Sequence, residues 1–216
     1  MKIFIDFDDI LFNTKRFKLD YLRCFEKYGV SKELFDECYY DPLSKGSVKK
    51  YDPAKHICRI FAKHKNSSAG LEQEVVAFVA DTRKYVFSDV FDFVKKNKRS
   101  DLFIISYSVT DFQKAKIANC GISNFFKTVE ITNKLKSGVI GKTIKKEKID
   151  LRKEAVYFIE DRLAQIENVK KLYPRIKTIL LKRKEGRYFD EKNKYCDFQC
   201  NSLGQVEKIL LKKDGK

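Results

Sequence analysis

The stretch Lys2-Ile3-Phe4-Ile5-Asp6-Phe7-Asp8-Asp9-Ile10-Leu11-Phe12 decides the fold of this chain. It opens with β-branched and aromatic residues, as a buried strand does, and then places three carboxylates within four positions. In an open α/β sheet, the chemistry lies at the carboxyl ends of the parallel strands. The stretch therefore predicts a strand that runs from Ile3 towards Phe7 and carries a polar site at its end.

The spacing of Asp6 and Asp8 indicates what this site does. If both residues leave the strand together, the period of two points their side chains to the same side. Two crowded carboxylates repel each other, and they are tolerated if a divalent cation lies between them or if one is protonated and works as an acid. The alternative is a strand that ends in a solvated acidic turn, and the Asp-x-Asp spacing favours the functional interpretation.

Length and composition limit the class of protein. The chain has 216 residues and 43% hydrophobic residues, enough for one core with a smaller attached unit. No apolar run approaches the roughly 20 residues that span a bilayer. The first residues run straight into the predicted strand, so no signal peptide is visible. We expect a cytoplasmic protein with no membrane partner.

The cysteines fit that compartment. Six are scattered along the chain, and free or buried thiols in a reducing cytoplasm explain them best. The spacing Cys196-x-x-x-Cys200 has no second pair of zinc ligands, and both histidines are distant in sequence. The sequence therefore disfavours a structural zinc site.

The net charge of +16 admits two interpretations. A strongly basic protein suits anionic partners such as phosphorylated metabolites, nucleic acid or an acidic surface. Alternatively, lysine simply occupies solvated positions. Lysines occur on nearly every predicted helix face and not in one block, which favours the second interpretation for most of them.

Hydrophobic periodicity divides the chain into two kinds of sequence. Residues 13–86 show helical spacing and no convincing strand, which predicts a small helical unit. After residue 86, helices alternate with further strands expected near 101–108, 125–131, 155–161, 176–181 and 196–198. This alternation predicts an α/β fold with a Rossmann-like, doubly wound parallel sheet built from residues 1–12 and 87–216.

The ends of three strands carry the polar residues. The first ends in Asp6-x-Asp8, the second in Ser106, and a later one in Glu160-Asp161. Parallel strands place their carboxyl ends along one edge, so these groups would converge with a lysine from the basic stretch around Lys134, Lys136 and Lys142. Carboxylates for a hard cation beside a hydroxyl and an ammonium group for an anion suit phosphoryl transfer.

These motifs resemble the haloacid dehalogenase superfamily, in the type with a helical cap inserted after the first motif. The resemblance covers nearly the whole chain: Ile3 to Leu11 is similar to motif one, Leu102 to Ser106 to motif two, and Ile159 to Asp161 to motif four. It implies that residues 13–86 form the cap. Each motif alone is degenerate, whereas all of them in order are specific.

The resemblance also implies residue roles. Asp6 would be the nucleophile that forms an aspartyl-phosphate, and Asp8 the general acid and base. Ser106 would hold a phosphoryl oxygen, with Tyr107 and the motif-three lysine also at the substrate. Magnesium would bind to Asp6, Asp161 and the backbone carbonyl of Asp8, with Glu160 contacting it through water.

Two positions depart from the family pattern. Ile10 stands where Thr or Val is usual, and it is still β-branched. The motif-three lysine has two candidates, because Lys136 precedes Ser137 at a predicted helix start and Lys134 lies just before it. Lys136 has the better placement.

The predicted function is a magnesium-dependent phosphatase that acts on a small phosphorylated metabolite or nucleotide. A phosphomutase shares the core residues, and a dehalogenase is disfavoured because that chemistry in the family lacks the second Asp. A basic nucleic-acid-binding protein, or a phosphatase acting on nucleic-acid ends, is the rival class. It has only the stretch Lys182 to Lys194, with Tyr188 and Phe189, in its favour and no recognised motif. The substrate and the oligomeric state are left open.

Overall fold

The computed structural model describes residues 1–40, 51–63, 70–108 and 111–212. The chain forms two compact units. The sheet unit comprises Met1–Lys15, Val86–Tyr107 and Ile122–Lys216, and the helical unit comprises Arg16–Tyr85 and Ser108–Gly121. The assignment of residues 13–86 as a cap stays a prediction.

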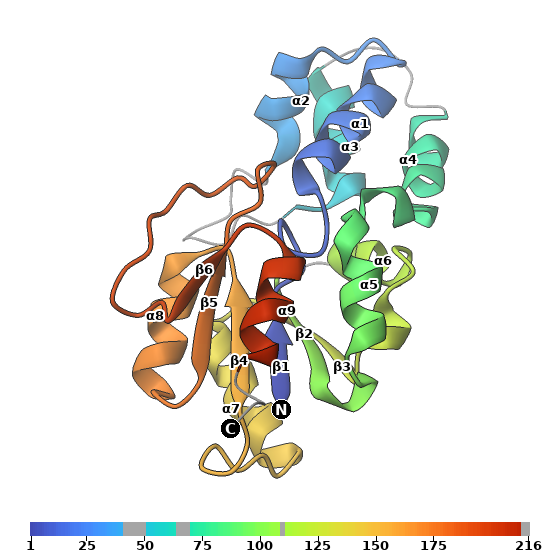
Figure 1. The fold of residues 1–216 in the computed structure, drawn as a ribbon. Helices are drawn as coiled ribbons and strands as arrows, with labels where there is room; N and C mark the ends of the chain where they lie inside the picture. The colour runs from blue at the N-terminus through green and yellow to red at the C-terminus, as the bar shows by residue number, and fades with distance from the viewer. Residues whose placement is uncertain (41–50, 64–69, 109–110, 213–216) are drawn as a thin grey trace. The chain divides into compact units, whose positions relative to one another are not determined.

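The sheet unit contains a six-stranded sheet in which every neighbouring pair is parallel. Its order is β3-β2-β1-β4-β5-β6 (Figure 1). The strands are β1 (Lys2–Ile5), β2 (Leu102–Tyr107), β3 (Thr128–Thr132), β4 (Val156–Glu160), β5 (Lys177–Leu181) and β6 (Phe198–Cys200). This order confirms the predicted doubly wound parallel sheet. Because the chain runs outwards from β1 on both sides, the ends of β1, β2 and β4 form the switch point where such sheets bind ligands.

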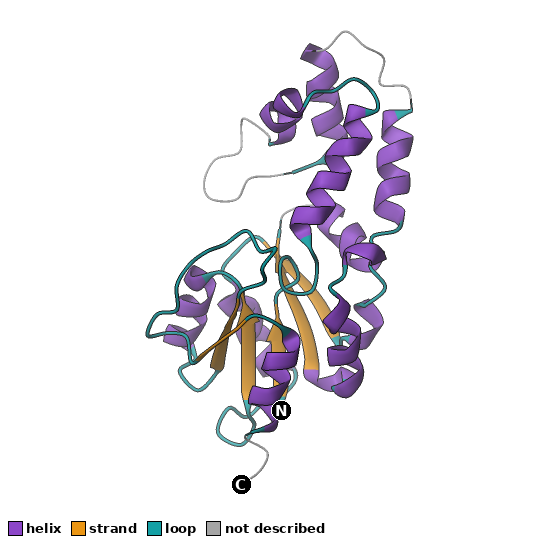
Figure 2. Cartoon of the chain, turned by 45° about the horizontal axis from the view of Figure 1, so that its top comes forward, coloured by secondary structure: helices purple, strands orange, loops and turns teal. Residues whose placement is uncertain are grey.

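Helices cover both faces of this sheet (Figure 2). Helices α7 (Lys136–Lys146) and α8 (Leu163–Leu172) pack together on one face, and α5 (Ser88–Lys96) and α9 (Leu203–Leu211) pack together on the other. Successive side chains of a strand point to opposite faces, and those of the central strands β1, β2 and β4 are almost all buried, so these strands contribute to the core on both faces. On the α7/α8 face, the rings of Phe4 and Phe103 lie 5.1 Å apart in the centre of the core.

The described residues of the helical unit contain helices and no strand. The helices of this region are α1 (Thr14–Glu26), α2 (Lys32–Tyr39), α3 (Pro53–Lys63), α4 (Leu71–Ala80) and α6 (Asp111–Ala118). An aromatic cluster forms the core, and His56 lies within it. Its Nε2 is 2.9 Å from the Phe35 carbonyl oxygen, and its Nδ1 is 3.2 Å from the Tyr51 hydroxyl. His56 is thus a fully buried core residue.

Several element ends differ from the predicted ones. The helical spacing of residues 13–86 continues past Ala80, but α4 ends there, because the Thr82 hydroxyl donates to the Lys116 carbonyl and so draws the chain out of the helix. Strand β6 begins at Phe198 and not Cys196, because the Asp197 carboxylate accepts the Thr178 N–H.

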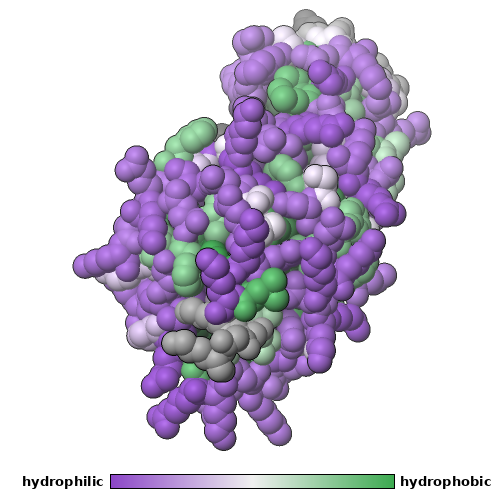
Figure 3. Space-filling view, in the orientation of Figure 1, coloured by the Kyte–Doolittle hydropathy of each residue, from purple (hydrophilic) through white to green (hydrophobic). Residues whose placement is uncertain are grey.

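The surface is dominated by hydrophilic side chains. On the face drawn in Figure 3, apolar residues appear only as small separate groups. Within the described ranges, no helix combines the length and the apolar character that crossing a bilayer requires. The cysteines of these ranges are free thiols, and Cys196 and Cys200 are buried.

Candidate active site

The ammonium group of Lys136 lies between two buried carboxylates. Its Nζ is 2.6 Å from Oδ1 of Asp6 and 2.6 Å from Oε2 of Glu160. Lys136 is the first residue of α7, and its backbone N–H donates to the Gln165 side chain. Burial lowers the pKa of Lys136, but attraction to Asp6 and Glu160 outweighs it and the net pKa is raised. Lys136 is therefore charged, whereas the rival candidate Lys134 is exposed.

Asp6 follows β1 directly and is almost completely buried. Its Oδ1 accepts a hydrogen bond of 2.7 Å from the N–H of Phe7 in addition to the contact with Lys136. Burial and the nearby Glu160 raise the pKa of Asp6 to about 8, against the opposing pull of Lys136. A carboxylate so placed becomes fully ionised when another cation joins Lys136.

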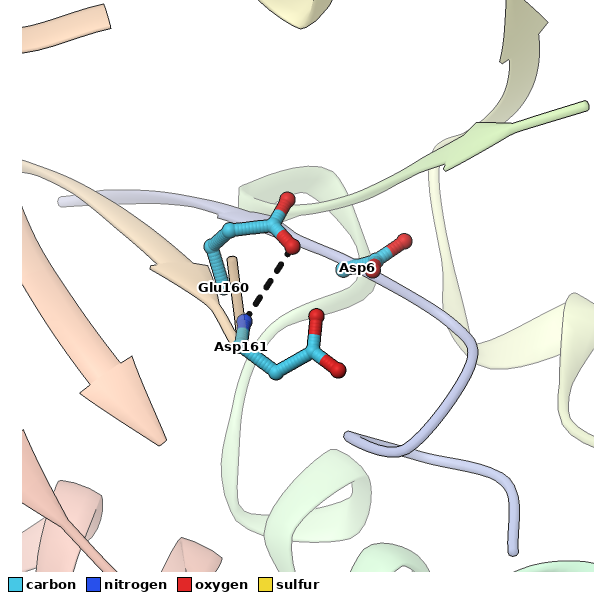
Figure 4. A group of neighbouring side chains, drawn as sticks. All are labelled: Asp6, Glu160 and Asp161. Carbon is cyan, nitrogen blue, oxygen red and sulfur yellow. Dashed lines mark hydrogen bonds between the residues drawn. The ribbon is translucent and has the colours of Figure 1, made fainter. Parts of the chain in front are cut away.

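Asp161 is the residue that most clearly fits a metal. Both of its carboxylate oxygens are buried and have no hydrogen-bond partner among the described residues. Figure 4 shows this carboxylate turned towards Asp6, and Asp6, Glu160 and Asp161 each offer an oxygen within 4.8 Å of the others. Burial, followed by the charges of Glu160 and Asp6, raises the pKa of Asp161 well above its usual range. A hard divalent cation would relieve this arrangement, since carboxylate oxygens are its preferred ligands.

Glu160 has a different role, because its oxygens are already occupied. Oε2 accepts from Lys136, and Oε1 accepts from the N–H groups of Asp161, at 3.1 Å, and Arg162. Burial opposes ionisation, but Lys136 and these donors outweigh it and lower the pKa of Glu160. The donor set therefore offers Asp6 and Asp161 as direct ligands, with Glu160 holding Lys136 and the turn after β4.

Asp8 lies beside this cluster and is partly exposed. Its Oδ1 accepts a hydrogen bond of 2.7 Å from the hydroxyl of Thr14, the first residue of α1. Asp8 also contributes to the electrostatic environment of Asp6. The carboxylate is thus both oriented and open to solvent, as a proton donor needs to be.

Ser106 and Tyr107 end β2, the strand next to β1. The pairing of Ile5 with Ile104 places Ser106 at the level of the residue that follows Asp6. Ser106 is buried, and Tyr107 is half-buried with its ring beneath the guanidinium of Arg162. The structure thus brings Asp6, Lys136 and Asp161 into one cluster, with Ser106 on the adjacent strand.

Asp9 and Arg187 form a pair that the sequence did not indicate. The Arg187 Nε donates to Oδ2 of Asp9 at 2.5 Å, and the Asp9 side chain is 1% exposed. Asp9 has a φ of 58°, a left-handed conformation that favours glycine. Arg187 belongs to the basic and aromatic stretch 182–194, so charge and aromatic content were its only signals in the sequence.

Two further residues of the site, Thr14 beside Asp8 and Arg162 over Tyr107, also belong to no motif that the sequence revealed.

Comparison with known proteins shows the fold. No family model and no curated protein matches the sequence. A haloacid dehalogenase-like hydrolase from Burkholderia xenovorans LB400 matches with a TM-score of 0.73 at 15% identity, over 97% of this chain and 96% of that chain. The HAD-hydrolase YfnB from Bacillus subtilis, bound to magnesium, matches with a TM-score of 0.61 at 14% identity, over 97% and 98%.

A structure described as a predicted phosphoglycolate phosphatase from Haemophilus somnus 129PT matches with a TM-score of 0.56 at 12% identity, over 97% of each chain. Dehalogenases are also among the similar structures. At these identities, the likeness concerns the fold. The chain has the haloacid dehalogenase-like fold that its motifs resemble.

Proposed function

We propose that this chain, with its haloacid dehalogenase-like fold, is a magnesium-dependent phosphohydrolase that acts on a phosphomonoester through an aspartyl-phosphate at Asp6. The observation that carries the proposal is the Asp161 carboxylate, whose two oxygens are buried and have no hydrogen-bond partner among the described residues. It faces the nucleophile candidate Asp6, which is paired with Lys136. The carboxylates could bind a cation, and the lysine could bind an anion directly beside it.

The residues of the chain divide the reaction into two displacements. A carboxylate oxygen of Asp6 attacks phosphorus, the bond from phosphorus to the ester oxygen breaks, and Asp8 donates its proton to that leaving oxygen. In the second step, Asp8 takes a proton from water, the water oxygen attacks phosphorus, and the bond to Asp6 breaks. Inorganic phosphate leaves and both aspartates return to their starting states.

Lys136 and Ser106 serve the phosphoryl group. The fixed ammonium of Lys136 offsets negative charge at Asp6 and at the transferring group, without needing to reorganise during the reaction. In this proposal the Ser106 hydroxyl, at the end of the neighbouring strand, donates to a phosphoryl oxygen. A magnesium ion held by Asp6 and Asp161 would supply charge neutralisation at the phosphoryl oxygens.

Asp8 separates this function from its main rival. A dehalogenase needs an attacking carboxylate but no proton for a halide leaving group. Asp8 is oriented by Thr14 and remains open to solvent, which favours an ester oxygen as the leaving atom. A phosphomutase would use the same residues and differ only in the acceptor of the phosphoryl group. The partner we propose is a small phosphorylated compound.

Release of inorganic phosphate from p-nitrophenyl phosphate tests the proposal. We expect turnover that requires magnesium and stops on addition of excess chelator, with recovery when magnesium is restored. Full activity in excess chelator would contradict the metal assignment. Release of halide from haloacids without any phosphate release would replace the proposal with a dehalogenase.

A further inference from the structure

The guanidinium of Arg162 lies over two tyrosine rings at the active-site edge of the sheet. Its Cζ lies 5.6 Å from the ring centroid of Tyr107 and 5.2 Å from that of Tyr188. Cation–π contacts with two rings restrain a guanidinium group without using its N–H donors. Tyr107 ends β2, whereas Tyr188 belongs to the loop between β5 and β6.

The topology locates this guanidinium close to Asp6. Arg162 follows β4 and Tyr107 ends β2, and β1 lies between these two strands. Neighbouring strands are about 4.8 Å apart, so β2 and β4 are separated by about twice that distance. The Arg162 guanidinium and the Tyr107 ring therefore meet across the carboxyl end of β1, the strand that Asp6 follows.

The guanidinium donors of Arg162 are not used by any of the described residues. Its backbone N–H donates to Glu160, but its guanidinium makes no hydrogen bond and no ion pair with the described residues. The other two arginines at this edge are committed: Arg183 is paired with Asp89, and Arg187 with Asp9. A guanidinium restrained by two rings, with donors that no described residue uses and a phosphoryl site nearby, is a preformed receptor for a planar or tetrahedral anion.

We infer that Arg162 binds a second anionic group of the substrate, beyond the phosphoryl group that reacts at Asp6. The substrate class is then a phosphomonoester that also carries a carboxylate or a second phosphate. Tyr107 and Tyr188 are positioning residues for Arg162. This inference rests on the proposed function, because it places the second anion relative to the phosphoryl group of that reaction.

Matched substrates test the inference. One series consists of simple alkyl phosphates, and the other of the same chains ending in a carboxylate or in a second phosphate. We expect wild-type protein to show a higher kcat/KM for the doubly anionic series. The Arg162→Met variant should reduce this selectivity ratio about tenfold to hundredfold, the range expected for a charge-assisted hydrogen bond. Arg162→Lys should retain only part of the wild-type selectivity ratio, because an ammonium group lacks the planar pair of donors.

Arg175→Met is the matched control. Arg175 is exposed and lies just before β5, at the amino ends of the strands and not at the carboxyl ends that carry the site. Its substitution therefore removes the same charge without touching the site. Its selectivity ratio should equal that of wild type. A wild-type protein without preference between the series, or an Arg162→Met variant that loses activity equally on both, would overturn the inference.

Calorimetry separates this inference from the proposed function. If no phosphate ester is hydrolysed, the proposed function is wrong. The anion site is then tested by itself, through calorimetric measurement of the binding of propane-1,3-diol bisphosphate. Weaker binding to Arg162→Met than to Arg175→Met would support the site. Equal affinity for both variants would overturn it.

Discussion

The guanidinium of Arg187 donates a hydrogen bond of 2.5 Å to the carboxylate of Asp9 across 178 positions of sequence. The contact ties the long loop between β5 and β6 to the turn that follows β1. Asp9 is buried and adopts a left-handed conformation, so the pair holds a strained residue directly beside Asp8. The geometry of the turn therefore depends on a residue near the other end of the chain.

Removal of Arg187 tests this dependence. Arg187→Met leaves the buried Asp9 carboxylate without its partner, and we expect a loss of about 3 kcal/mol in the free energy of unfolding, measured with urea. Asp9→Gly removes the charge and supplies the residue that tolerates this φ, so it should cost less. In the Asp9→Gly background, Arg187→Met should then be nearly neutral. Simple additivity of the two changes would show that the pair is not coupled.

Substitutions of the two aspartates that follow β1, Asp6 and Asp8, should impair the reaction in different ways. Asp6→Asn removes the attacking oxygen and a candidate metal ligand, so activity should fall to background and no phosphorylated protein should form. Asp8→Asn removes only the proton donor and base, which is worth about 10²–10⁴-fold. With an activated aryl phosphate, a phosphate adduct on Asp6 should accumulate and be visible by mass spectrometry after acid quench. An adduct on Asp8, or variants that are indistinguishable on activated and unactivated esters, would reverse the assignment.

Magnesium should stabilise the wild-type protein through Asp161. Without a cation, the Asp161 oxygens are buried and have no partner among the described residues, so Asp161→Asn should be at least as stable as wild type in a thermal-shift assay. On addition of magnesium, Tm should rise for wild type and stay unchanged for Asp161→Asn. Asp197→Asn is the control, because Asp197 is paired with Lys170 and lies away from the site. An equal rise in all three proteins would argue against the site.

His56 should make the helical unit sensitive to acid. Burial lowers the pKa of His56 to about 4, compared with 6.5 when the chain is unfolded. Between these values the unfolded chain binds a proton that the folded chain excludes, so stability falls as pH drops below 6.5 and the loss levels off below 4. From pH 7 to pH 5, this amounts to about 2 kcal/mol.

Thermal unfolding of wild type and His56→Gln at the two pH values measures the effect. The variant is expected to be less stable at pH 7, because glutamine fills the aromatic cluster poorly. The decisive quantity is the change in Tm between pH 7 and pH 5, which should be smaller in the variant. An identical change in both proteins would show that other groups cause the acid sensitivity.

The sequence alone determined the elements and the edge of the sheet that carries the chemistry. Strand and helix periods are local properties, so the strands that end at Asp6, Ser106 and Glu160 could be recognised from short windows. Parallel order then follows from the alternation of helix and strand. Element ends were less predictable, because side chains such as those of Thr82 and Asp197 compete for backbone groups only once their distant partners are near.

Only the tertiary structure decided which charged residues act together. Lys134 and Lys136 differ little as local sequence, yet Lys136 lies between Asp6 and Glu160 while Lys134 is exposed. Arg162 contacts Tyr188, and Arg187 pairs with Asp9, and both partners are distant in the sequence. The physical reason is that burial and pairing energies depend on which groups share a low-dielectric space, and that is a property of packing and not of spacing along the sequence.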